Sequence, residues 1–383
     1  MKQEAISYLS TEKENLIELS KYIYNNPEES YKEFKTSMYI TEFLEKRGFT
    51  IEKNFQNIST AFKATIGSGE PNLCFICEYD AIKDKGHLTA HNTLCSIQVG
   101  AAIALSKVLE KLNNPATITV LGCPGEYLGG VKETFLRQGV FEEIDTIFEI
   151  NPNIITSDNR TSCAVIPLEI SFESKNCNKC SYSSVDALLL LSNILKILEK
   201  SFNYNNVQID YSIPEANMHP FIKSDKSLLR LMLKSKQIEN IEGVQDKIKS
   251  IANFISELLN VDNTTCLYQP PSKPLKSNNT LNRLFSNNLK ESGIINTQGT
   301  INSQCSLNIG SISETIPTIS PLISIVDSGE SICYGSTEFS KASIKDTANE
   351  IAFKTSIALF CTAIDLIEKP ELLSEAKQEL NTK

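Results

Sequence analysis

NLCFICEY, residues 72–79, is an apolar run of strand length, and it is followed by a helical stretch and then by a second apolar run. The helical stretch is TLCSIQVGAAIALSKVLEKL at 93–112, and the second run is ATITVLGC at 116–123. DTIFEI at 145–150 continues the pattern. Strands that alternate with helices of this length predict an α/β fold with a largely parallel sheet covered on both faces.

The flanking segments extend this domain. TAFKATIG at 60–67 predicts another strand, preceded by one helix that ends before NNPEES and a second helix over about 30–47. ANEIAFKTSIALFCTAIDLIEK, at 348–369, predicts an apolar helix that returns to the same domain.

The middle of the chain has a different pattern. AVIPLEISFES (164–174), NVQIDYSI (206–213) and TTCLYQP (264–270) predict strands, while SSVDALLLLSNILKILEK (183–200) and 226–260 predict helices. This β-α-β-α-β order is compatible with a compact split-βαβ, ferredoxin-like α+β unit. We therefore expect residues 1–164 and 276–383 to form the α/β domain and residues 165–275 to form an inserted domain.

Composition narrows the function classes. A net charge of -9 and the lack of a basic stripe argue against a nucleic-acid surface. No apolar run approaches the roughly 20 residues that a membrane span needs. The first residues alternate charged with apolar side chains at helical spacing, unlike a signal peptide or anchor. The eleven cysteines are an odd number, so reduced thiols in a cytoplasm are expected.

Four polar segments follow predicted strands. They are EYDA (78–81), GHLTAHN (86–92), PGEYLGG (124–130) and INPN (150–153). In such sheets, functional groups gather in the loops after the carboxyl ends of the strands. GHLTAHN also carries His87 and His91, two of the three histidines in the chain.

These loops, taken in order, resemble those of the zinc-dependent aminoacylase/carboxypeptidase amidohydrolases, peptidase family M-twenty. The branch with aminobenzoyl-glutamate hydrolases and peptidase-like dipeptidases is the most similar. The resemblance covers nearly the whole chain and includes NNPEESYKEFKTSMYITEFLEKRGF (25–49), VKETFLRQGVFEEIDTIFEI (131–150) and YQPPSKPLKSNNTLNRLF (268–285). It implies a catalytic domain that carries two metal ions and an inserted lid through which the protein forms a homodimer.

The metal-binding motifs of that family are altered in this chain. In the loop that resembles G-H-A-C-G-H-N, the ligand histidine is matched by His91 and the bridging cysteine by Thr89. In the segment that resembles P-A-E-E, Glu126 matches the general base and Tyr127 the ligand glutamate. Asn151 stands where the next ligand histidine is expected.

Further positions differ in the same way. Gly335 stands at the last metal ligand, Asn178 at the substrate-contacting histidine of the lid, Asn308 at an aspartate, and Ser320 at a histidine. Asp80 matches an acid of the family. One of the five ligands therefore remains, whereas two divalent ions need anionic or imidazole donors. We expect no bound metal cofactor and regard His91 as a vestigial ligand.

Each candidate also has a simpler interpretation. His91 and His87 could be hydrogen-bonded loop histidines, and Asp80 could cap its loop. Glu126 is either a catalytic base or a carboxylate left in a cleft, because a general base needs a metal-activated water to act on. Thr89, Tyr127, Asn151 and Asn178 are candidate substrate-binding residues.

The cysteines suggest other chemistry. The pair at 74–77 lies in a predicted strand, so its two residues are expected to differ in face and exposure and to serve core packing. The pair at 177–180 lies at a strand-to-helix turn, where a redox or metal role is geometrically possible. A thiolate from Cys95 or Cys123 could pair with His91 as nucleophile and base.

Three functions remain open. The favoured one is a metal-free pseudoenzyme that binds a small acyl-amino-acid-like or peptide-like ligand, or a partner protein. The alternative is an enzyme that uses Glu126 on a small amide or dipeptide by metal-independent or single-metal chemistry. A conventional metallo-amidohydrolase is the third, and it is hard to assemble from three histidines when His219 lies in the predicted lid.

Overall fold

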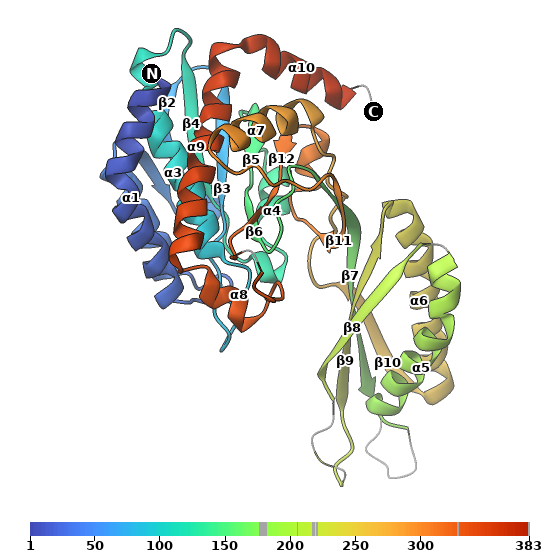
Figure 1. Cartoon of the computed structure of the whole chain (residues 1–383). Coiled ribbons are helices and arrows are strands. Elements are labelled where there is room, and N and C mark those ends of the chain that lie inside the picture. The colour runs from blue at the N-terminus through green and yellow to red at the C-terminus, as the bar shows by residue number, and fades with distance from the viewer. Residues whose placement is uncertain (176–181, 205, 217–218, 220, 328, 382–383) are drawn as a thin grey trace. The chain divides into compact units, whose positions relative to one another are not determined.

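The computed structural model describes the chain except for residues 176–181, 205, 217–218, 220, 328 and 382–383 (Figure 1). The described chain divides into two compact units. Unit 1 consists of Met1–Thr161, Lys276–Asn302 and Ile312–Lys383, and unit 2 consists of Ser162–Leu275 and Ser303–Ser311.

Unit 1 is built on a sheet whose six strands follow the order β1-β2-β4-β3-β5-β12. Pairing is parallel from β4 through β3 and β5 to β12, and antiparallel between β1, β2 and β4. Every residue of β3 is buried, and because successive side chains point to opposite faces, both faces of the sheet are covered there. The predicted, mostly parallel α/β fold is confirmed. The strand bounds are β1 Thr50–Lys53, β2 Phe62–Ser68, β3 Asn72–Cys77, β4 Ala116–Gly122, β5 Thr146–Phe148 and β12 Thr318–Ile319.

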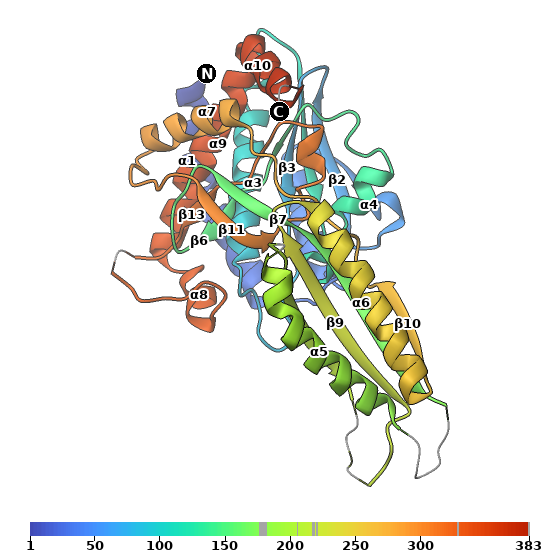
Figure 2. The same ribbon diagram turned by 90° about the vertical axis from the view of Figure 1, so that its right-hand side faces the viewer.

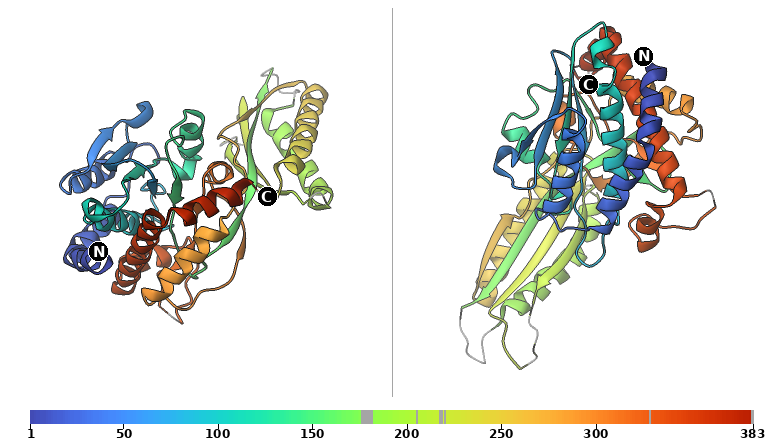
Figure 3. Two further views of the ribbon diagram at one scale, coloured as in Figure 1. Left: turned by 90° about the horizontal axis from the view of Figure 1, so that it is seen from above. Right: turned by 90° about the vertical axis from the view of Figure 1, so that its left-hand side faces the viewer.

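Three long helices of unit 1 pack side by side: α1 (Lys2–Asn25), α3 (His91–Ser106) and α9 (Asp346–Glu368) (Figure 3). The close approach depends on Gly100 of α3, where a Cβ would lie 2.7 Å from Ser356 Oγ. The helix predicted over 93–112 ends earlier, at Ser106. The remaining helices of unit 1 are α2 Phe34–Glu45, α4 Lys132–Arg137, α7 Asn279–Glu291, α8 Thr337–Ala342 and α10 Pro370–Asn381.

Gly122 gives a prediction about the packing of this sheet. A Cβ at this position would overlap Cε1 of Phe62, whose ring is fully buried. We expect Gly122→Ala to lower the free energy of unfolding by about 1–3 kcal/mol, the usual effect of overpacking. Gly243→Ala is the control, because it lies within a helix where a Cβ meets no atom within 4 Å. Urea denaturation should show the control unchanged or stabilised, and equal values for both variants would contradict the prediction.

Unit 2 has an antiparallel sheet in the order β10-β7-β9-β8, with β11 also paired to β7. Its two helices, α5 (Ser184–Tyr204) and α6 (Ile238–Leu259), lie on the same face of that sheet (Figure 2). The resulting β-α-β-β-α-β order is the predicted split-βαβ unit. The strands are β7 Arg160–Ser174, β8 Gln208–Glu215, β9 Lys226–Ser235, β10 Val261–Leu267 and β11 Ile301–Ser306.

The single helix predicted over 226–260 is wrong for its first ten residues, which form β9. The sequence KSLLRLMLKS is rich in good helix formers, which explains the error. Its burial nevertheless alternates, with Leu229, Leu231 and Leu233 fully buried. A period of two is the pattern of a strand with one face on the core.

Two further features concern the INPN segment and the length and polarity of the helices. INPN was expected to be a loop, but Asn151–Asn153 form the short strand β6, which pairs in parallel with β13 (Leu322–Ser324). In the described part of the chain, the helices are too short or too polar to cross a membrane.

Candidate functional site

Three acidic residues follow parallel strands of unit 1. Glu78 comes directly after β3, Glu126 begins a 3-10 turn (Glu126–Leu128) after β4, and Glu149 comes directly after β5. These strands are neighbours and run the same way, so their carboxyl ends meet at one edge of the sheet. The acidic groups are therefore brought together from positions far apart in the sequence.

His91 is buried at the start of α3, with acidic groups at both ring nitrogens. Nδ1 lies 2.9 Å from the backbone oxygen of Asp80 and 3.1 Å from its Oδ1, and Nε2 lies 3.5 Å from Oε2 of Glu78. Burial by itself would lower the pKa of His91, but the hydrogen bond and charge of Asp80 and the charge of Glu78 raise it to about 9. The ring is therefore an imidazolium at neutral pH.

Asp80 is fully buried and takes part in several hydrogen bonds. Its Oδ2 accepts from Ser30 Oγ at 2.7 Å and from the backbone N–H of Tyr127 at 3.0 Å. Burial raises the pKa of Asp80, but its hydrogen bond with His91 and the histidine charge hold the pKa below the usual value. These contacts tie Asp80 to Ser30, Tyr127 and His91 on neighbouring segments.

Thr89 and Tyr127 are bonded to each other. Thr89 Oγ1 and Tyr127 Oη are 2.5 Å apart, and the Tyr127 ring stacks on His91 with 5.1 Å between centroids. Burial raises the pKa of the Tyr127 phenol, so it stays neutral. Two positions that the resemblance assigns to metal ligands thus form a neutral hydrogen-bonded pair.

Lys132, at the start of α4, is the cation that the three acids surround. Its Nζ contacts Oε1 of Glu78, lies 2.6 Å from Oε1 of Glu149 and lies 3.3 Å from Oε2 of Glu126. We call these four residues the Lys132 cluster. The exposed side-chain fractions are 1% for Lys132, 5% for Glu78, 2% for Glu149 and 20% for Glu126.

The charged groups in the Lys132 cluster shift one another's pKa values. Burial lowers the pKa of Lys132, but the surrounding carboxylates raise it well above its usual range. Burial also raises the pKa of Glu149, yet Lys132 holds it below the usual value. Burial and the Glu126 charge raise the pKa of Glu78 to about 8. Lys132 and Glu149 therefore form a charged pair beside a carboxyl group that is mostly protonated at neutral pH.

Ser320 and Asn151 support Glu149 from the other side. Ser320 Oγ donates to Glu149 Oε2 at 2.9 Å and accepts from Arg160 Nη2 at 2.7 Å and from Asn151 Nδ2 at 3.0 Å. Asn151 Nδ2 also donates to the backbone oxygen of Glu149 at 2.9 Å. Two positions that the resemblance matches to histidines therefore hold a carboxylate in place.

The remaining predicted residues lie elsewhere in the chain. Asn178, Cys177 and Cys180 lie outside the described residues. Asn308 belongs to unit 2, and Gly335, with a φ of +77°, has no side chain to contribute.

The cysteines lie in the core. Cys74 and Cys77 are both fully buried, so core packing is confirmed, whereas the expected difference in exposure is wrong. Cys95 Sγ donates to the backbone oxygen of Glu78 at 3.0 Å. Burial raises the pKa of Cys95 and of Cys123 well above the usual value, which disfavours a thiolate nucleophile at either position.

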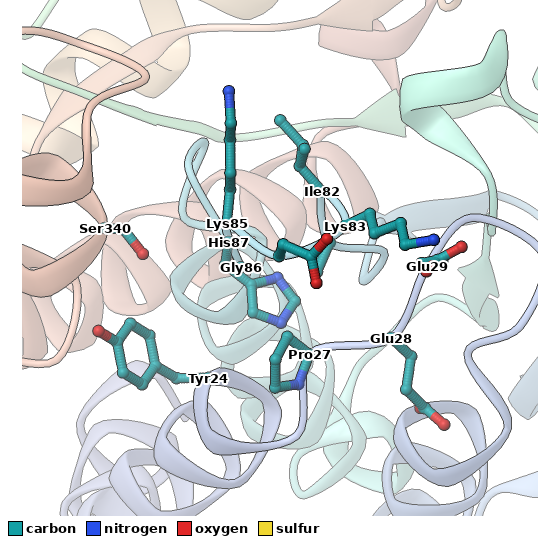
Figure 4. Close-up of a pocket in the computed structure, with 12 residues that line it drawn as sticks. Tyr24, Pro27, Glu28, Glu29, Ile82, Lys83, Lys85, Gly86, His87 and Ser340 are labelled. Carbon is teal, nitrogen blue, oxygen red and sulfur yellow. The ribbon is translucent and has the colours of Figure 1, made fainter.

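His87 lines a surface cavity of about 490 Å³ formed by Tyr24, residues 27–29, residues 81–87 and Ser340 (Figure 4). Its Nε2 donates to the backbone oxygen of Ile23 at 3.0 Å. Burial lowers the pKa of His87 to about 4, so the ring is neutral. His87 fits the interpretation of a hydrogen-bonded loop histidine.

Lys132, Glu78 and Glu149 were not predicted as site residues from the sequence. Glu78 and Glu149 each follow a predicted strand directly, which was a usable signal. Lys132 lies in VKETFLR, a segment that reads as an ordinary surface turn. Within the described residues, no group of three or more His, Cys, Asp or Glu side chains is arranged to hold a metal ion.

Comparison with known proteins adds three similarities, while no family model matches the sequence. The chain is 24% identical over 268 residues to one of the subunits of the p-aminobenzoyl-glutamate hydrolase of Escherichia coli, covering 64% of this chain and 56% of that protein. It is 24% identical over 408 residues to the Xaa-Arg dipeptidase of Mus musculus, covering 100% of this chain and 93% of that protein. A solved structure from Bacillus subtilis, described as a dinuclear metal-binding peptidase of family M-twenty, matches with a TM-score of 0.62 at 16% identity, covering 91% and 99% of the two chains.

Proposed function

We propose that this chain is a relative of the amidohydrolases and dipeptidases of peptidase family M-twenty and that it works without metal ions. In this proposal it is a pseudoenzyme that binds a small acyl-amino-acid-like or peptide-like ligand. The ligand class is supported by the names of two relatives, one a hydrolase of p-aminobenzoyl-glutamate and one a dipeptidase for Xaa-Arg. Each name specifies a substrate in which an amino acid is joined through an amide bond.

The observation that carries the proposal is the position of His91. A metal needs the lone pair of a neutral imidazole, but both ring nitrogens of His91 face carboxyl or carbonyl oxygens. Thr89 and Tyr127 are bonded to each other and offer no anionic donor. The carboxyl groups of Glu78, Glu126 and Glu149 contact Lys132, and that of Asp80 contacts His91. These residues do not fit a pair of divalent cations, which require anionic or imidazole ligands.

The proposal predicts that the protein purified without chelators carries less than about 0.1 equivalent of zinc or manganese per chain. We expect no hydrolysis of a panel of N-acyl amino acids and dipeptides, because no metal lowers the pKa of an attacking water. A panel member that binds should raise the melting temperature, and the rise should grow with the logarithm of its concentration above the dissociation constant. Two equivalents of metal per chain, or hydrolysis that a chelator abolishes, would contradict the proposal.

A second candidate is metal-independent hydrolysis with Glu126 as the base. It is favoured by the exposure of Glu126, whose side chain is 20% accessible, whereas those of Glu78 and Glu149 are 5% and 2% accessible. Glu126→Gln measured against the wild type on the same panel separates the two functions. If the wild type turns over no panel member, this candidate fails.

We also propose a homodimer formed through unit 2, in a reducing compartment such as the cytoplasm. Large apolar side chains are exposed on both helices of this unit, which supports a contact there. They are Leu189 and Ile197 on α5, and Phe254 and Leu258 on α6. Sedimentation velocity of the purified chain tests the dimer, and a monomer at micromolar concentration would contradict it.

A further inference from the structure

The Lys132 cluster places one ammonium group among three carboxyl groups. The acids come from the carboxyl ends of the neighbouring strands β3, β4 and β5, and the lysine reaches them from α4. A buried ion pair normally matches one acid with one base. Here three acids face one ammonium, and the His91 imidazolium lies 3.5 Å from the far oxygen of Glu78.

The arrangement of oxygens around Nζ resembles a coordination shell. Oxygens of Glu78, Glu126 and Glu149 converge on a single buried point, and that point holds a positive charge. Divalent cations such as manganese take carboxylate oxygens in this way, at about 2.0–2.6 Å. The cation present is an ammonium held covalently by the chain.

We infer that the Lys132 ammonium stands in for a bound cation, and that shortening this side chain opens a site for a single divalent metal ion. The inference rests on the proposed function, because a chain that already holds metal needs no stand-in. The inference goes beyond the proposed function. It names the Lys132 ammonium as the group in the place of a metal ion, and the three acids of the Lys132 cluster as the side chains that would hold such an ion.

The test compares Lys132→Ala with Lys132→Met and the wild type, using manganese chloride or zinc chloride as the probe. Alanine leaves a cavity at the centre of the cluster, whereas methionine is neutral and fills most of the same space. We expect Lys132→Ala to bind about one equivalent of manganese per chain and to melt at a higher temperature with the metal present. Lys132→Met and the wild type should bind no metal at this site, and adding the metal should leave the melting temperature of each unchanged.

The double variant Lys132→Ala with Glu149→Gln should lose most of the metal binding, because it removes a charged ligand. A Lys132→Ala variant that takes up no metal overturns the inference while leaving the proposed function intact. The same holds if that variant stays unfolded with metal present, because the metal then fails to replace the ammonium. Metal bound by the wild type at these carboxylates would instead overturn the proposed function.

Discussion

Replacing Lys132 by methionine is expected to lower the free energy of unfolding by about 3–5 kcal/mol. The change leaves the Glu149 carboxylate buried without its cation, and an uncompensated buried charge is costly. Urea denaturation followed by circular dichroism measures the loss. Lys345→Met is the matched control, because Lys345 pairs with Glu330 at 2.6 Å on the surface. An exposed pair contributes less than about 1 kcal/mol.

A second variant separates lost charge from lost packing. Lys132→Met combined with Glu149→Gln removes both members of the buried pair, so it should be more stable than Lys132→Met. If Lys132→Met is within about 1 kcal/mol of the wild type, or if the added Glu149→Gln destabilises further, the cluster does not contribute as described.

The free energy of unfolding should also fall as the pH rises from about 6.5 to 9. The pKa of His91 is about 9 in the folded chain against an ordinary 6.5, so the folded state holds the proton more tightly. This stabilisation is complete below pH 6.5 and is lost as the pH rises through 9. A rise in the pKa of His91 from 6.5 to about 9 corresponds to roughly 3 kcal/mol at most. Glu78 acts in the same direction between pH 4.5 and 8.

Two histidine variants test whether His91 causes the alkaline part of this pH dependence. His91→Gln should flatten the decline above pH 8, where Glu78 no longer contributes. His87→Gln is the control, because the lowered pKa of His87, about 4, stabilises the folded chain above pH 6.5 and the benefit is lost as the pH falls through 4. It should change the acid limb and leave the alkaline limb as in the wild type. An unchanged alkaline limb in His91→Gln would refute the assignment.

The parallel sheet could be predicted from the sequence because its strands are apolar on both faces. NLCFICEY and ATITVLGC became β3 and β4, and the helix between them became α3. The carboxyl ends of such strands mark an edge of the sheet, so the loops with His91 and Glu126 were found from position alone. Such patterns can be recognised because buried positions are filled by apolar residues, which the sequence shows directly.

Other features depend on contacts between distant residues. β9 was missed because leucine and lysine favour a helix locally, and the sheet pairing with β7 decides otherwise. Lys132 was missed because a lone lysine usually indicates a solvated surface. Its burial follows from three carboxyl groups supplied by three different strand ends, which no local pattern shows.

Unit 2 is built from two segments of the chain, and this limits how it can be expressed apart from unit 1. Ser303–Ser311 belongs to this unit although the residues on either side, up to Asn302 and from Ile312, belong to unit 1. Most of β11 lies in that segment and pairs with β7. A continuous fragment from Ser162 to Leu275 would lack β11 and leave part of an apolar strand edge open, which invites aggregation. Expressed separately, unit 2 would need a graft that carries β11 back to β7.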